Sequence, residues 1–155
     1  MKHKLLVAVD GTEISFNIAD YLAQACADSE TAGVRIVVFH VLPRLPPNVE
    51  GSKAAAADKR AEKFAGKAWD KAEQMLAQIK DRMVRAGVNP ESLTTEAADE
   101  EGDVVEQIIQ AAATHGCDTI VAGRHEQSIF GRFLASSVGE HLLHKAVGYA
   151  IWLVE

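Results

Sequence analysis

The sequence contains only two cysteines, Cys26 and Cys117, and neither lies at a metal-ligand spacing from the other or from a histidine. Isolated cysteines of this kind are most often reduced core residues. No run approaches the roughly 20 apolar residues that a membrane helix needs. The apolar segment that follows the basic residues 1–4 ends at Asp10, which is too short for a secretory signal. We therefore expect reduced thiols, no membrane partner and a cytoplasmic location.

Basic residues are in the minority, since 16 Lys and Arg face 22 Asp and Glu, for a net charge of −6. Nucleic-acid binding depends on clustered Lys and Arg, so we expect no nucleic-acid partner. One local exception is a row of lysines at steps of four: Lys59, Lys63, Lys67 and Lys71. Acidic residues flank this row: Asp58, Glu62, Asp70 and Glu73. The mixture predicts a solvated helix face of both signs.

Several chemical motifs are missing too, namely a nucleophile elbow, a Walker loop and the G-x-G-x-x-G fingerprint. His141 and His144 lie three apart, but no cysteine or acidic pair completes a metal site by spacing. A slow nucleotide hydrolase would have to use Asp10 or His40 as its general base and Arg124 to stabilise phosphate. With so few groups available, we expect a protein that binds and associates, not an enzyme.

What the chain does contain is an ordinary apolar content of 48% over 155 residues, which fits one domain spanning residues 1–155. Apolar runs predict strands covered on both faces, as in a parallel sheet. The expected strands are Lys4–Val9, Val34–Val41, a polar edge strand Leu93–Ala97, Asp118–Ala122 and a final strand Tyr149–Val154. Helices are expected between them, so the pattern predicts a doubly wound α/β fold with five strands and four helices.

The helices are predicted from apolar spacing and from their end signals. The first carries Phe16, Ala19, Leu22 and Cys26, with Thr12 as its cap. The second, from about Ala56 to Ala86, has an inner face of Phe64, Ala68, Ala72, Met75, Ile79 and Met83. The third opens at Gly102-Asp103 and closes at Gly116, and the fourth covers Ser136–Lys145.

Ligands of an open parallel sheet bind beyond the carboxyl ends of the strands, where the strand order reverses. Three segments lie at such ends: Asp10-Gly11-Thr12, His40-Val41-Leu42 and Gly123-Arg124-His125-Glu126. We expect them to form the ligand site. An aspartate at a strand end, such as Asp10, is often only a turn former or a helix cap, and Thr12 and Ser136 fit the role of helix caps better than that of ligands. His125 beside Glu126 could form a carboxylate-imidazole pair.

At these segments the chain resembles the universal stress protein family, over essentially its whole length. The shared features are Val-Ala-Val-Asp-Gly-Thr at 7–12, His-Val-Leu at 40–42, Gly-Asp-Val-Val-Glu-Gln-Ile-Ile at 102–109, Cys-Asp-Thr-Ile-Val-Ala-Gly-Arg at 117–124 and Ser-Ser-Val at 136–138. The resemblance implies a Rossmann-like, adenine-nucleotide-hydrolase-like fold of strand order 3-2-1-4-5, with helices on both faces, and a homodimer.

Family members that bind ATP carry Gly, two residues, Gly, nine residues, then Gly followed by Ser or Thr. Here Gly123 matches, but Glu126 and Ser136 replace the other two glycines, with Ser137 in the Ser/Thr place before Val138. A glycine lets backbone N–H groups approach phosphate, and a glutamate repels it. Arg124 and Arg132 remain as phosphate partners. By resemblance, Asp10 would hold the ribose or nucleotide-bound Mg²⁺ and the main chain of Val41 would read adenine.

Two versions of the function follow. In the first, ATP binding is weakened or lost and the dimer is the functional unit. In the second, the site still accepts ATP or AMP with Mg²⁺. The response-regulator receiver is a rival with the same topology, but Asp10 lacks the second acidic residue that a receiver carries there.

The last strand predicts a partner. It is apolar and free of proline at a sheet edge, so pairing with its twin across a two-fold axis would cover it. Ile151, Trp152 and Leu153 are the expected contacts, with Trp152 or Ile151 as the anchor.

Overall fold

The computed structural model describes residues 3–26, 33–44, 54–124 and 138–155. Within them the chain forms one sheet whose neighbouring strands all pair in parallel. The strands are β1 Lys4–Ala8, β2 Arg35–Leu42, β3 Leu93–Asp99, β4 Thr119–Gly123 and β5 Ala150–Val154, in the order β3-β2-β1-β4-β5. The predicted strand order is confirmed, and β3 and β5 are the edges.

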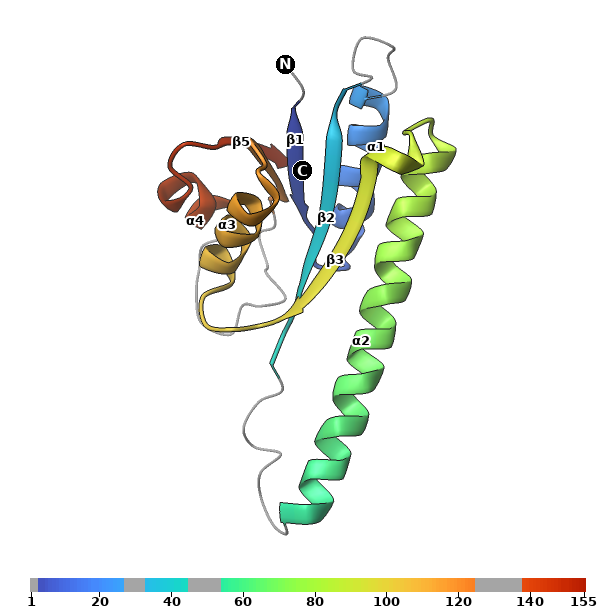
Figure 1. Ribbon diagram of the computed structural model, residues 1–155, viewed down its shortest axis with the longest axis vertical. Helices are drawn as coiled ribbons and strands as arrows, with labels where there is room; N and C mark the ends of the chain where they lie inside the picture. The colour runs from blue at the N-terminus through green and yellow to red at the C-terminus, as the bar shows by residue number, and fades with distance from the viewer. Residues whose placement is uncertain (1–2, 27–32, 45–53, 125–137) are drawn as a thin grey trace.

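Helices cover both faces of this sheet (Figure 1). The described helices are α1 Glu13–Cys26, α2 Ala54–Arg85, α3 Val104–His115 and α4 Val138–Lys145, with a short 3-10 helix, η3, at Pro90–Ser92. The core on one face is built with α1 and α2, and the core on the other face with α3 and α4. This is the doubly wound arrangement that the alternating pattern predicts.

The inner strands β1, β2 and β4 are largely apolar because both of their faces are buried. In β1, Leu5 and Val7 pack toward α1 and α2, whereas Leu6 packs toward α3. Alternation within β4 follows the same rule, since Val121 belongs to the first core and Ile120 to the second. A strand with two buried faces leaves no polar positions to alternate, which is why the sequence shows continuous apolar runs.

The third helix begins and ends where the sequence predicts. The Asp103 side chain accepts a hydrogen bond from the backbone N–H of Val105 at 2.9 Å and caps α3. At the other end Gly116 adopts the left-handed conformation, with φ of 63°, and its N–H reaches back to the last carbonyl groups of the helix.

The inner face predicted for the long helix α2 is correct at Ala72, Ile79 and Met83, but it omits the buried Leu76 and includes the exposed Phe64. Among residues 61–85, whose side chains the structure describes, the buried residues of α2 are Ala72, Leu76, Ile79 and Met83, and all four lie in its C-terminal half. Phe64, which we placed on the inner face, is 56% exposed. The physical reason is length: the N-terminal half of α2 runs past the carboxyl edge of the sheet, where no strand covers it (Figure 1).

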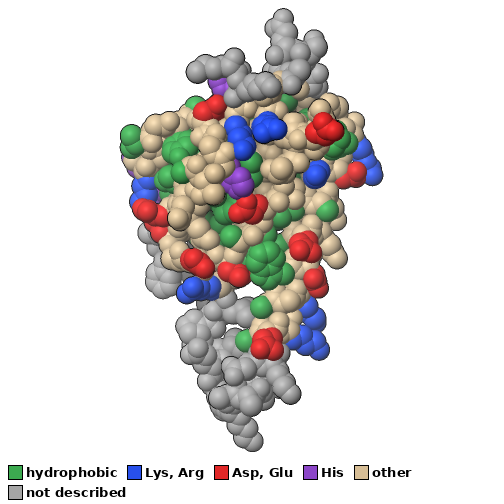
Figure 2. Space-filling model, viewed as in Figure 1, with side chains coloured by type: hydrophobic (Ala, Val, Ile, Leu, Met, Phe, Trp, Pro, Cys, Tyr) green, Lys and Arg blue, Asp and Glu red, His purple; other side chains and the backbone are tan. Residues whose placement is uncertain are grey.

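Charges of both signs share the surface. On α2, Lys63, Lys67 and Lys71 are exposed, and so are the acidic neighbours Glu62, Asp70 and Glu73. Figure 2 shows the same interspersed pattern over the viewed face of the molecule. None of the described helices combines the length and the apolar character that crossing a bilayer requires.

Candidate functional site

The turn that follows β1 is organised around the Asp10 carboxylate. Its Oδ1 accepts hydrogen bonds from Thr12 N at 2.9 Å and from Thr12 Oγ1 at 2.6 Å. Gly11 adopts a φ of 82°, a conformation that L side chains rarely take. Thr12 was expected to cap α1 with its side chain. Its hydroxyl donates to Asp10, a charged and therefore strong acceptor, which fixes the Thr12 side chain in this turn; its role as a cap stays a prediction.

A third donor to Asp10 comes from a residue that the sequence argument missed. The Ser15 hydroxyl donates to Asp10 Oδ1 at 3.0 Å and accepts from the backbone N–H groups of Asp10 and Gly11, each at 3.1 Å. Ser15 is only 1% exposed. The signal that could have found it is a serine in the first turn of the helix, five residues after the strand-end aspartate.

A pocket of about 610 Å³, counting its part open to solvent, lies at the carboxyl ends of β1, β2 and β4. It opens between α1 on one side and the beginnings of α3 and α4 on the other. Its walls are mostly apolar and consist of Ala8, Val9, Asp10, Ile14, Ser15, Ile18, Phe39, Val41, Val104, Ile108, Ala122, Gly123 and Val138.

Of the predicted site residues, Asp10, Val41, Gly123 and Val138 thus meet in one pocket. Their meeting follows from topology, because β1 and β4 lie side by side and their crossovers run to opposite faces. Five further predicted residues, His125, Glu126, Arg132, Ser136 and Ser137, lie outside the described residues.

His40 does not line this pocket. It is buried on the α1 and α2 side of β2, and its Nδ1 lies 2.8 Å from the carbonyl oxygen of Val9. A carbonyl oxygen can only accept, so Nδ1 carries the proton. The histidine therefore ties the end of β1 to β2, which is a structural role next to the site.

Gly123 makes room for a neighbouring side chain. A Cβ added at this position would lie 2.3 Å from Cγ2 of Ile14, far inside van der Waals contact. The close approach of α1 to β4 thus requires glycine here, independently of any phosphate. The retention of this one glycine of the family pattern is explained by packing.

Arg124, the residue that follows, is exposed and forms an ion pair with Glu155. The guanidinium that was expected to meet a phosphate therefore has a carboxylate partner within the chain.

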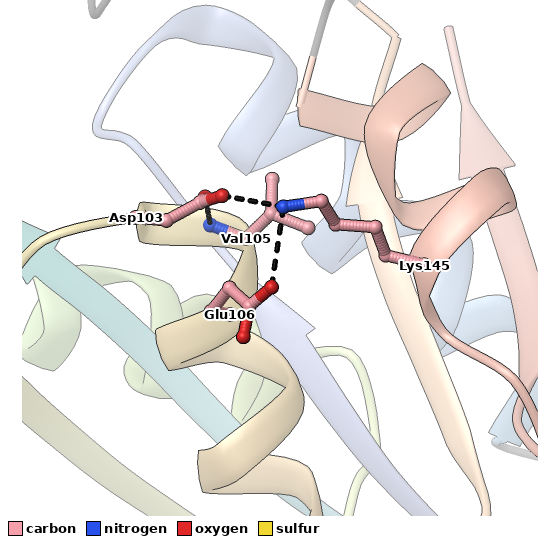
Figure 3. Close-up of polar contacts among 4 residues, drawn as sticks. All are labelled: Asp103, Val105, Glu106 and Lys145. Carbon is pink, nitrogen blue, oxygen red and sulfur yellow. Dashed lines mark hydrogen bonds and ion pairs between the residues drawn. The ribbon is translucent and has the colours of Figure 1, made fainter.

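A charged cluster links the two helices that line the far side of the pocket (Figure 3). Lys145 Nζ, in the last turn of α4, donates to Asp103 Oδ2 at 2.6 Å and to Glu106 Oε1 at 3.2 Å. The hydrogen bond from Lys145 lowers the pKa of Asp103, and the bond to Asp103 raises the pKa of Lys145. The cluster holds α4 against the start of α3, whose Val104 is part of the pocket wall.

In the part of the chain that the structure describes, no group of three or more His, Cys, Asp and Glu side chains is arranged to hold a metal. Cys117 is buried, and burial raises the pKa of its thiol. This thiol is therefore poorly reactive.

The edge strand β5 presents one large aromatic side chain to solvent. Trp152 is 39% exposed and packs edge-to-face against Tyr21 of α1, with ring centroids 6.4 Å apart. Ile151 and Leu153, the neighbours of Trp152, pack toward α3 and α4 instead. Of the two anchors that we considered, Trp152 is the one on the exposed side.

The comparisons with known proteins agree with this fold. The Universal stress protein family model matches residues 1–147. A solved structure of a member of that family from Burkholderia pseudomallei is similar, with a TM-score of 0.70 and 22% identity over 99% of this chain and 96% of that chain. The universal stress protein from Archaeoglobus fulgidus in complex with dAMP has a TM-score of 0.64 and 16% identity over 100% of both chains.

A universal stress protein in complex with cAMP has a TM-score of 0.62 and 18% identity over 99% of this chain and 97% of that chain. Identities this low show a shared fold and no more. No curated protein sequence matches the chain significantly.

Proposed function

This chain belongs to the universal stress protein family, and we propose that it acts by binding an adenine nucleotide through its base and sugar, with weakened affinity for a triphosphate. The observation that carries this proposal is the apolar pocket at the ends of β1, β2 and β4, with the Asp10 carboxylate in its wall. Solved relatives in complex with cAMP and dAMP support adenosine monophosphates as the ligand class.

The wall of the pocket suits the flat apolar body of a base better than it suits phosphate. Among the described lining residues there is no lysine or arginine, and Asp10 carries the only charge. A carboxylate repels phosphate and accepts hydrogen bonds from hydroxyl groups. We infer that the sugar lies beside Asp10 and the base beside Val41, with the phosphate directed outward.

The affinity for a triphosphate should be low because two glycines of the ATP-binding pattern are replaced in this chain. Glu126 and Ser136 stand where ATP-binding relatives have glycine. A carboxylate about 4 Å from a phosphate costs on the order of 4 kcal/mol at an effective dielectric near 20. That penalty corresponds to a loss of about two to three orders of magnitude in affinity.

Binding is a better interpretation of this pocket than catalysis. A hydrolytic site needs a general base within reach of the attacking water. The imidazole of His40 is bonded to the Val9 carbonyl outside the pocket, so Asp10 is left as the single candidate base among the described lining residues, and no lysine or arginine stands among them to stabilise a phosphate.

The test is calorimetric titration of the purified protein with adenosine, AMP, ADP and ATP in Mg²⁺, after denaturation of a separate sample to identify small molecules that copurify with it. We expect AMP to bind, and ATP to bind no more tightly than AMP. Absence of heat with every nucleotide, from a folded sample, would overturn the proposal.

A second function, self-association, is favoured by the β5 edge. The strand ends the sheet without a neighbour among the described residues, and Trp152 and Tyr21 form an exposed aromatic pair beside it. Aromatic residues of this kind are common anchors of protein interfaces.

We propose a homodimer through β5. Trp152→Glu should yield a monomer in light scattering, whereas Phe64→Glu, at a similarly exposed aromatic on α2, should remain a dimer. A dimeric Trp152→Glu variant would count against this interface.

A further inference from the structure

A buried serine holds together the turn that carries Asp10. The single hydroxyl of Ser15 takes part in three hydrogen bonds, one to the carboxylate of Asp10 and two from backbone N–H groups of the same turn. It is 1% exposed and forms part of the pocket wall. Ser15 therefore fixes both the backbone and the side chain of the residue that we expect to face the sugar.

The hydrogen bonds are all on one oxygen of the carboxylate. Oδ1 accepts from Thr12 N, Thr12 Oγ1 and Ser15 Oγ, while Oδ2 receives no hydrogen bond from the described residues. The last torsion of an aspartate side chain is broad, so its hydrogen bonds decide how the carboxylate is oriented. With Oδ1 fixed, Oδ2 is the acceptor that remains for a ligand.

We propose that Ser15 is a positioning residue, which orients the Asp10 carboxylate so that Oδ2 accepts hydrogen bonds from the sugar hydroxyls of a bound nucleotide. This inference rests on the proposed function and adds to it a determinant of specificity. Removal of the Ser15 hydroxyl takes one of three donors from Oδ1 and the shared acceptor from two N–H groups. The carboxylate then loses its fixed orientation, and the protein loses its preference for a ligand with free hydroxyls.

The experiment compares AMP with 2′,3′-dideoxy-AMP, which has the same base and phosphate but no sugar hydroxyls, by calorimetry. A hydrogen bond to a charged acceptor corresponds to about a tenfold difference in affinity. We expect the wild-type protein to prefer AMP by about this factor, and Ser15→Ala to bind the two ligands almost equally. Ser92→Ala is the matched control, because Ser92 Oγ also bonds within a turn but lies directly before β3, at the amino end of the strands and away from the pocket.

A purely structural role for Ser15 predicts a different result: Ser15→Ala would weaken both ligands by the same factor and keep the preference, which would overturn the inference. Equal affinities in the wild-type protein would also overturn it, while the proposed function would stand because AMP still binds. If the wild-type protein bound neither ligand, both the inference and the proposed function would be overturned.

A second variant serves if Ser15→Ala does not fold. Thr12→Val removes one donor to Oδ1 from a less buried position, and the preference of this variant for AMP should shrink in part. An unchanged preference for AMP in Thr12→Val would overturn the inference.

Discussion

Arg124 Nη1 donates a hydrogen bond to Glu155 Oε1 at 2.8 Å, at the point where β4 and β5 end side by side. The backbone continues the same pairing, since Arg124 N donates to the carbonyl oxygen of Val154 at 2.8 Å. Both side chains are exposed, at 58% for Arg124 and 75% for Glu155. The Glu155 carboxylate is thus paired with Arg124, the residue that directly follows the pocket residue Gly123. It competes with a phosphate for the Arg124 guanidinium.

Glu155→Gln should therefore raise the affinity for AMP. Exposed ion pairs are worth up to about 1 kcal/mol, so the expected gain is about two- to fivefold, and adenosine, which lacks phosphate, should bind as before. Calorimetry at low salt measures both. Glu73→Gln on α2 removes the same charge elsewhere and controls for net charge. An equal gain in affinity for adenosine would show that Arg124 does not contact the phosphate.

Glu126→Gly combined with Ser136→Gly restores the glycine pattern of ATP-binding relatives. If the glutamate repels the phosphates, the double variant should bind ATP about two to three orders of magnitude more tightly than the wild-type protein. The affinity for adenosine should change little. Titration of both ligands into the single and double variants separates the two positions. A double variant without any gain for ATP would place the obstacle in the pocket itself.

Gly123→Ala tests whether this glycine serves packing. The added Cβ would lie 2.3 Å from Ile14 Cγ2, and overpacking of this kind costs about 1–3 kcal/mol. Ile14→Ala removes that methyl group, so the double variant should be less destabilised than the sum of the single variants. Urea unfolding of the four proteins measures the coupling. Strict additivity would mean that α1 shifts freely and that the contact is unimportant.

The ion pair between Asp103 and Lys145 should make the free energy of unfolding fall at both low and high pH. The folded pKa of Asp103 is lowered, so its contribution is complete above the unfolded pKa of about 3.9 and is lost as the pH falls through the folded pKa. The folded pKa of Lys145 is raised, so its contribution is complete below its unfolded value of about 10.4 and is lost as the pH rises through the folded one. Asp103→Ala should cost about 0.5–2 kcal/mol at pH 7, since it removes the cap of α3.

Asp103→Asn separates the two roles, because asparagine caps a helix as well as aspartate does but carries no charge. The difference between the wild type and Asp103→Asn in urea unfolding should shrink as the pH is lowered from about 5 toward the folded pKa. A difference that is constant over this range would show that the charge of Asp103 contributes nothing. Asp81→Asn, at an exposed pair within α2, is the control.

Some features of the site could be predicted because they follow from the chain order alone. The strand ends at Asp10, Val41 and Gly123 converge once the sheet order is known, and that order follows from right-handed crossovers and the family resemblance. Contacts between side chains could not be predicted in this way. Ser15 is one of seven serines in the sequence, and only the fold shows that its hydroxyl is buried against Asp10.

The alternation of strands and helices, the buried character of β1, β2 and β4 and the segments that line the pocket could all be predicted from the sequence, because burial on two faces and helix-end signals are local properties of the chain. The tertiary structure decided how those segments are used. Phe64 became exposed because α2 is longer than the sheet it covers, a relation between two distant elements. Arg124 pairs with Glu155, and Gly123 packs against Ile14, because strand register and helix packing bring together residues that are far apart in the sequence. No local sequence pattern predicts such contacts.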